Sequence, residues 1–231
     1  MSEAMLKPAA PMLPPKVVIF DLDGTLLNSI EVVTTSLAET LQVELGLEHQ
    51  AEDLVWAVGP PIAETIEKLM PGETPERRRE VLDSYRGRYT ARSLDVKPYP
   101  GIMDALRALH ARGIRMAIAT SKQEVAAQEI VEHLGIDKMM VAVCGADPNE
   151  IHADKSGIVG EALKGLGIST PVDQGERVVM VGDRFYDVVG AGKNGIPTLF
   201  VTWAGTSAEG EADDAFAVAG SAEEMLVALG L

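Results

Sequence analysis

The sequence of 231 residues predicts an α/β protein: a parallel sheet covered by helices on both faces, with an all-helical segment inserted after the first strand. Three observations predict this class. Short apolar runs alternate with helical stretches, as they do where each strand is followed by a crossover helix. The runs lack the polar–apolar alternation of a half-exposed strand, which indicates burial on both faces. A long region, residues 30–97, contains no run of the strand type.

The expected strands are the apolar runs rich in valine, isoleucine and leucine. They are residues 16–20, 115–120, 139–143, 177–181 and 197–201. Between them lie stretches with helical spacing of apolar residues, each ending in a glycine, a residue that commonly stops a helix. These expected helices are residues 101–113, 124–135 and 155–167. This alternation of strands and helices along the chain predicts a Rossmann-like core.

Residues 30–97 are expected to form a separate helical domain. Residues 31–46 repeat apolar side chains at helical spacing, and "AEDLVWAVG", "AETIEKLM" and "ERRREVLDSYRGRYTARS" predict further helices separated by prolines. Four prolines between residues 8 and 15 predict an extended, flexible arm. The predicted division is an arm at 1–15, a core formed by 16–29 and 98–231, and the helical insertion at 30–97.

Composition narrows the class of partner. Apolar residues make up 46% of the chain, enough for a sizeable core. A net charge of −15 without a large basic stripe argues against nucleic acid. The single cysteine, Cys144, excludes an intrachain disulfide. With no membrane-spanning run and no signal-peptide pattern, we expect a cytoplasmic protein, and the oligomeric state stays open.

Polar residues follow three of the expected strands at their carboxyl ends, the edge where open parallel sheets bind ligands. They are Asp21, Asp23, Gly24 and Thr25 after the first strand, Thr120, Ser121 and Lys122 after the second, and Gly182, Asp183 and Asp187 after the fourth. Several carboxylates sharing a dry crevice need a cation. Oxygen ligands without nearby histidine or cysteine select a hard ion, with Mg²⁺ as the first choice.

The two aspartates after the first strand suggest two different chemical roles. Asp21 is the natural nucleophile, because carboxylates attack phosphorus and form aspartyl-phosphates. Asp23 can give a proton to the leaving oxygen and later take one from water. Gly24 allows a close backbone approach and offers an N–H group to an anion.

Four motifs occur in a characteristic order: "DLDGT" (21–25), "ATSK" (119–122), Lys155 and "GDRFYD" (182–187). Together they resemble the haloacid dehalogenase-like superfamily of phosphohydrolases, over nearly the whole chain after Lys16. The helical insertion resembles the cap domain of the phosphoglycolate phosphatase-like branch. "VGPPIAET" (58–65) is most similar to a subgroup labelled phosphoglycolate phosphatase or 5′-nucleotidase.

The resemblance implies roles in phosphoryl transfer. Asp21 would be the nucleophile and Asp23 the general acid and base. Thr120 would hydrogen-bond the transferring phosphoryl group, helped by the backbone of Ser121, although relatives often carry asparagine at this second position. Lys155 would neutralise charge on the phosphoryl group and on the nucleophile.

The resemblance also implies a Mg²⁺ site. Asp183 would hold the ion together with Asp21 and the carbonyl of Asp23. Asp187 would act through a metal-bound water or from the outer shell. A cap that closes would exclude water and recognise the leaving group.

Several alternatives stay open. A phosphomutase of the β-phosphoglucomutase type would use the same aspartyl-phosphate, and a catalytically silent binding protein could share the fold. Dehalogenation is disfavoured because dehalogenase relatives lack the aspartate found here as Asp23. In the arginine-rich stretch of the insertion, Arg86 or Arg88 is a candidate to bind a second anionic group, against the alternative of a solvated helix face.

Overall fold

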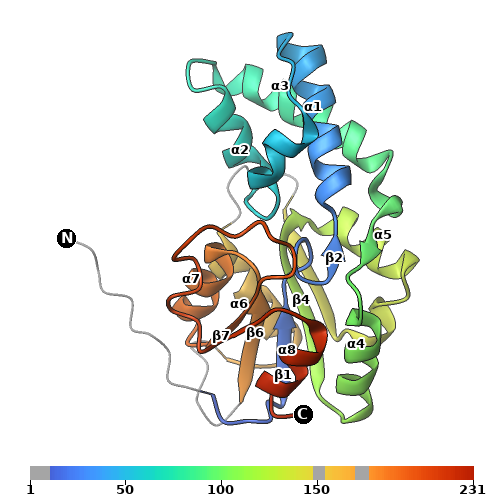
Figure 1. The fold of residues 1–231 in the computed structure, drawn as a ribbon, viewed down its shortest axis with the longest axis vertical. Helices are drawn as coiled ribbons and strands as arrows, with labels where there is room; N and C mark the ends of the chain where they lie inside the picture. Colours follow the sequence, from blue (N-terminus) through green and yellow to red (C-terminus); the bar gives the residue numbers. More distant parts are fainter. Residues whose placement is uncertain (1–10, 148–153, 170–176) are drawn as a thin grey trace, which may run out of the picture.

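The structure is a computed structural model, and it describes residues 11–147, 154–169 and 177–231. A six-stranded parallel sheet in the order β5-β4-β1-β6-β7-β8 forms its centre (Figure 1). The strands are β1 Val17–Phe20, β4 Arg115–Gln123, β5 Ala142–Ala146, β6 Val178–Gly182, β7 Thr198–Val201 and β8 Ala217–Ala219. The predicted α/β class with a parallel sheet is confirmed.

Helices cover both faces of the sheet, as the buried strands require. Alternate residues of β1 enter opposite cores: Val18 and Phe20 pack with α4, α5 and α8, whereas Val17 and Ile19 pack with α6 and α7. The helices are α4 Ile102–Ala111, α5 Glu124–His133, α6 Lys155–Gly165, α7 Phe185–Lys193 and α8 Ala222–Ala228. This two-sided burial explains why the central strands read as continuous apolar runs.

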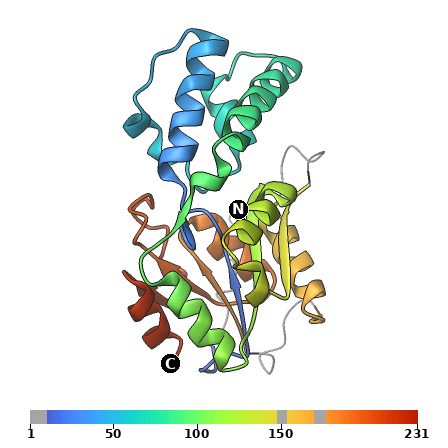
Figure 2. The ribbon, with the colours of Figure 1, turned by 90° about the vertical axis from the view of Figure 1, so that its right-hand side faces the viewer.

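The inserted segment is helical and lies beyond the carboxyl end of the sheet (Figures 1 and 2). It contains α1 Ile30–Leu45, α2 Ile62–Leu69, α3 Pro75–Thr90 and 3-10 helices at Ala51–Ala57 and Ser93–Asp95. Two short antiparallel strands, β2 Leu27–Asn28 and β3 Lys97–Pro98, bring the entering and leaving chains side by side. The division of the chain into an arm, a core and a cap domain stays a prediction.

The bounds of two expected strands are wrong. The strand expected at residues 139–143 lies at β5 instead, after a 3-10 helix at Asp137–Met139, and it is only half-buried because it is an edge strand. An apolar run alone does not separate a strand from a helical turn. The helix expected in the stretch AEDLVWAVG is present, as a 3-10 helix at Ala51–Ala57. β4 continues to Gln123, and β8 and α8 were not expected.

In the part of the chain that the structure describes, no helix has both the length and the apolar character needed to cross a membrane.

Candidate active site

Three buried aspartates meet at the carboxyl end of the sheet. Asp21 follows β1 and Asp183 follows the neighbouring β6, while Asp187 lies in the first turn of α7. Their exposed fractions are 4%, 1% and 1%. One carboxylate oxygen from each lies within 4.8 Å of the others. Such a cluster, shielded from water, is strongly repulsive without a neighbouring cation.

The start of α6 brings a lysine into this cluster. Asp154 caps the helix by accepting a hydrogen bond from the backbone N–H of Ser156 at 3.2 Å, which places Lys155 at the first helical position. The Lys155 Nζ lies 2.5 Å from Asp21 Oδ1 and 2.8 Å from Asp187 Oδ1. The lysine is only 5% exposed, so its charge acts inside the cluster rather than in solvent.

One lysine does not neutralise three carboxylates. Burial raises the pKa of Asp21 to about 7; Lys155 opposes this rise, and Asp187 and Asp23 add to it. Burial and the charges of Asp21 and Asp187 also raise the pKa of Asp183 well above its usual value. Burial is the main cause of both raised pKa values, the neighbouring carboxylates add to them, and a bound cation would favour the ionised forms. This oxygen-only, buried donor set could hold a metal ion and fits a hard cation such as Mg²⁺.

Asp183 is oriented by contacts from two loops. Thr25 Oγ1 donates a hydrogen bond to Asp183 Oδ1 at 2.9 Å, and Thr206 Oγ1 donates to Oδ2 at 3.3 Å. The indole N–H of Trp203 in turn donates to the carbonyl of Thr25 at 3.0 Å. Gly24 has φ +85°, and a Cβ there would overlap the Asp183 carboxylate. The glycine is therefore required both by the backbone conformation and by the close approach of the two loops.

Thr120, Ser121 and Lys122 lie within β4 rather than after it, because the strand continues to Gln123. Thr120 is buried, and its Oγ1 accepts a hydrogen bond from the backbone N–H of Lys122 at 3.2 Å. Ser121 lines the same cavity as the catalytic candidates. The expected phosphate contacts of Thr120 and Ser121 stay predictions.

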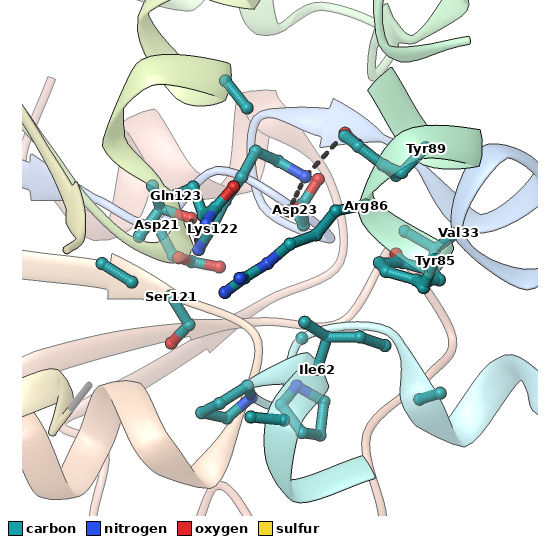
Figure 3. A pocket seen from close by; sticks show the side chains of 18 of the residues that line it. Asp21, Asp23, Val33, Ile62, Tyr85, Arg86, Tyr89, Ser121, Lys122 and Gln123 are labelled. Atoms are coloured by element: carbon teal, nitrogen blue, oxygen red, sulfur yellow. Dashed lines mark hydrogen bonds and ion pairs between the residues drawn. The ribbon is translucent and has the colours of Figure 1, made fainter. Parts of the chain in front are cut away.

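Asp23 has a lysine of its own. The Lys122 Nζ lies 2.8 Å from Asp23 Oδ2 and donates to the Tyr89 hydroxyl on α3 at 2.6 Å (Figure 3). The same Nζ lies 4.0 Å from the centroid of the Tyr89 ring. Burial lowers the pKa of Lys122, but Asp23 and the neighbouring tyrosines outweigh it and raise that pKa above its usual value.

A cavity lies between the sheet and the inserted helices. The core side contributes Asp21, Asp23 and residues 120–123, and the inserted segment contributes Ala57, residues 59–63, Tyr85, Arg86 and Tyr89. Arg86 projects into this cavity from α3 (Figure 3). With its amide oriented to accept, the Gln123 side-chain oxygen receives hydrogen bonds from Arg86 Nη2 at 3.1 Å and from Nε at 3.2 Å.

The inserted segment also contacts the core near α7. The Arg184 guanidinium donates to the Val58 carbonyl and pairs with Glu211, with Nε 3.0 Å from Glu211 Oε2. The Tyr186 hydroxyl donates to Glu64 on α2 at 2.9 Å. The cavity is thus flanked by polar contacts from β4 and from the α7 end of the core.

Sequence reasoning placed the four aspartates and Lys155 in one crevice, and the structure brings them together there. It assigned no role to Lys122, Tyr89 or Tyr85. A signal for Lys122 was present, since this lysine directly follows the Thr120–Ser121 pair. Two tyrosines four residues apart on a helix share a face, but nothing local shows that this face covers the site.

Comparison with known proteins agrees with this geometry. A family model described as haloacid dehalogenase-like hydrolase matches residues 18–201. Tyrosine-protein kinase PtkA of Mycobacterium tuberculosis is 38% identical over 191 residues, which are 82% of this chain and 62% of the relative. This chain therefore spans less than two thirds of that protein.

Two further relatives match over most of both chains. Pyrophosphatase PpaX of Halalkalibacterium halodurans is 29% identical, covering 81% of this chain and 83% of the relative. A 5′-nucleotidase of Pseudomonas aeruginosa is 31% identical, covering 80% and 81%.

The fold is shared with solved structures. A predicted phosphatase from Clostridium acetobutylicum superimposes with a TM-score of 0.85 at 29% identity, covering 94% of this chain and 99% of the other. The family model spans most of the chain, and the motif residues quoted from this sequence converge on one crevice. The chain belongs to the haloacid dehalogenase-like hydrolases.

Proposed function

We propose that this protein is a Mg²⁺-dependent phosphatase that hydrolyses a small phosphorylated metabolite through an aspartyl-phosphate on Asp21. The observation that carries the proposal is the buried cluster of three aspartates with Lys155 inserted between two of them. A surplus of carboxylates around a nucleophile is a poor anion site by itself. With a cation and a buried lysine it becomes suited to a phosphoryl group.

The reaction has two proton-balanced steps. In the first, Asp21 attacks phosphorus, the bond from phosphorus to the leaving oxygen breaks, and that oxygen takes the bond electrons and a proton from Asp23. In the second, Asp23 takes a proton from water, whose oxygen attacks phosphorus and releases Asp21. Lys155 donates to the nucleophile and to the transferring oxygens throughout.

In this proposal the metal is held by Asp21, Asp183 and the carbonyl of Asp23, with Asp187 acting directly or from the outer shell. When bound, Mg²⁺ supplies positive charge that stabilises the transferring phosphoryl group. The closeness of the three buried carboxylates supports this assignment, because one carboxylate oxygen from each lies within 4.8 Å of the others.

We further propose that the substrate carries a second anionic group, which Arg86 binds. This guanidinium lies in the cavity and has Gln123 as a neutral partner there, while its ion pair with exposed Asp83 at 3.3 Å is weak. An arginine that faces a cavity can bind a carboxylate or phosphate bidentately. Phosphoglycolate and pyrophosphate fit this description better than a phosphate ester with a neutral leaving group does.

The first experiment measures phosphate release from phosphoglycolate, pyrophosphate, nucleoside 5′-monophosphates, sugar phosphates and an aryl phosphate, with Mg²⁺ or with chelator. We expect Mg²⁺-dependent release that Asp21→Asn abolishes. Phosphate release that survives this substitution would contradict the mechanism. Turnover of a sugar 1-phosphate without phosphate release would indicate a mutase, and transfer from ATP to tyrosine a kinase. An inactive but folded protein would indicate a binding role.

The recognition proposal has a matched pair of variants. Arg86→Met should raise KM for substrates with a second anion about 10- to 100-fold, the loss of one charge-assisted pair, and leave KM for aryl phosphate unchanged. Arg88→Met is the control, because Arg88 lies on the same helix but hydrogen-bonds Ser84 and does not line this cavity. An equal change in KM for both substrate types would contradict the role of Arg86.

A further inference from the structure

We propose that Lys122 is a positioning residue that holds the carboxyl group of Asp23 for proton transfer, and that Tyr89 makes this hold depend on contact between the inserted helices and the core. The inference rests on the proposed function, since it assumes that Asp23 exchanges protons with the leaving group and with water. Lys122 would act through Asp23 and would not itself take part in the reaction.

Hydrogen-bond chemistry decides how Lys122 orients Asp23. An ammonium group has only donors, so Asp23 Oδ2, 2.8 Å from Lys122 Nζ, must accept. In this proposal the other oxygen, Oδ1, is the one that exchanges the proton. That oxygen is buried and has no hydrogen-bond partner among the described residues, while Asp23 itself lines the cavity. Lys122 thus occupies one oxygen and leaves the other for the reacting groups.

The lysine is held in turn by the inserted segment. Tyr89 lies on α3, and its hydroxyl accepts from Lys122 Nζ at 2.6 Å while its ring lies 4.0 Å from the same atom. Tyr85 stacks on Tyr89, with ring centroids 6.0 Å apart. No other hydroxyl contacts this ammonium group among the residues that the structure describes. Moving α3 away from β4 would remove this contact and free Lys122 to rotate.

This arrangement would couple the orientation of Asp23 to the contact between the inserted helices and the core. With the inserted helices docked, Lys122 contacts both Asp23 and Tyr89. With them apart, Lys122 loses one of its two fixed partners, and the carboxyl group loses its orientation. Proton transfer is then efficient only when the substrate is enclosed.

The test compares leaving groups in single-turnover experiments with enzyme in excess. A nitrophenolate leaves without a proton, whereas an alkoxide needs one from Asp23. We expect Lys122→Met to slow alcohol release from an alkyl phosphate about 10- to 100-fold, part of what general acid catalysis contributes, and to slow nitrophenol release less than about 3-fold. Lys122→Arg, which keeps a cationic donor, should restore most of the alkyl rate.

Tyr89→Phe removes only the hydroxyl and keeps the ring, so we expect a slowing of the alkyl reaction of about 2- to 10-fold with little change in the aryl reaction. Lys164→Met, at an exposed position on α6, is the control for loss of a lysine. Equal slowing of both substrates by Lys122→Met, or slowing of neither, would overturn the role of Lys122. An unchanged alkyl rate in Tyr89→Phe would overturn the coupling.

Failure of this inference is distinguishable from failure of the proposed function. If Asp21→Asn abolishes activity while Lys122→Met changes both leaving groups equally, the phosphatase mechanism stands and the positioning role falls. If Asp21→Asn retains activity, both fall. Binding of beryllium trifluoride, a mimic of the aspartyl-phosphate, should survive in Lys122→Met, which shows that the nucleophile site remains formed.

Discussion

Replacing Asp21, the proposed nucleophile, should stabilise the metal-free protein. Burial raises the pKa of Asp21 from its ordinary 3.8 to about 7. Each tenfold change in acidity corresponds to about 1.4 kcal/mol, so ionised Asp21 destabilises the metal-free fold by up to about 4 kcal/mol. Asparagine resembles the neutral acid in shape and carries no charge. Asp21→Asn therefore removes this penalty together with the reaction.

The sign of the effect depends on pH. Between about pH 4 and pH 7 the folded protein keeps a proton that the unfolded chain has lost, so the free energy of unfolding falls as pH rises and stays low above pH 7. At pH 8 Asp21→Asn should raise the melting temperature by roughly 8 to 16 °C, from 2 to 4 °C per kcal/mol for a chain of this size. At pH 5 the folded protein holds a proton that the unfolded chain has mostly lost, so about 1.6 kcal/mol of the penalty remains and the difference in melting temperature should shrink to roughly 3 to 6 °C.

Scanning calorimetry in chelator at pH 5 and pH 8 measures both differences. Mg²⁺ should narrow the gap at pH 8, because the wild type gains binding free energy that the variant loses. Asp104→Asn, at a position whose side chain is 86% exposed, is the control and should show no such dependence on pH. Two results would refute the electrostatic argument. One is an Asp21→Asn variant that melts at or below the wild-type temperature at pH 8, and the other is a variant that exceeds the wild-type melting temperature by the same amount at pH 5 and pH 8.

Two further predictions concern the residues around the cluster. Lys155→Met should lower kcat about 10²- to 10³-fold while the protein stays folded by circular dichroism, because a buried cation at the reacting phosphoryl group is lost; activity within threefold of wild type would contradict its role. Gly24→Ala should lower the melting temperature and weaken Mg²⁺ binding by calorimetric titration, because its Cβ would overlap Asp183. Gly113→Ala is the matched control: Gly113 also has positive φ, but nothing lies within 4 Å of the Cβ position, so it should cost only about 1–2 kcal/mol and leave Mg²⁺ binding intact. Equal effects of the two glycine changes would show that backbone strain alone matters.

The sheet could be predicted from the sequence because its signals are local. Each central strand is a continuous apolar run that leads into polar residues, and its burial on both faces explains why polar and apolar residues do not alternate along it. The edge strand β5 was harder to predict from the sequence. β5 is half-buried, and its neighbouring apolar residues form a 3-10 turn, so the run at 139–143 carried no information on where the strand begins.

The aspartates could be placed together for the same local reason. Residues that follow neighbouring parallel strands emerge at one edge, so Asp21 and Asp183 must lie near each other once β1 and β6 are adjacent. The chemistry of shared carboxylates then implied a cation. What the sequence could not give was the balance of charge, which depends on how deeply each group is buried.

The sequence by itself determined the sheet, the helical character of the insertion and the set of candidate site residues, because these follow from residue type, periodicity and strand ends. Only the tertiary structure decided which lysine pairs with which aspartate. Lys155 contacts Asp21, 134 residues away in the sequence, and Lys122 contacts Asp23. It also brought Tyr89 and Arg86 of α3 over the site. Such contacts depend on how the inserted helices pack against the sheet, and no local sequence pattern predicts that packing.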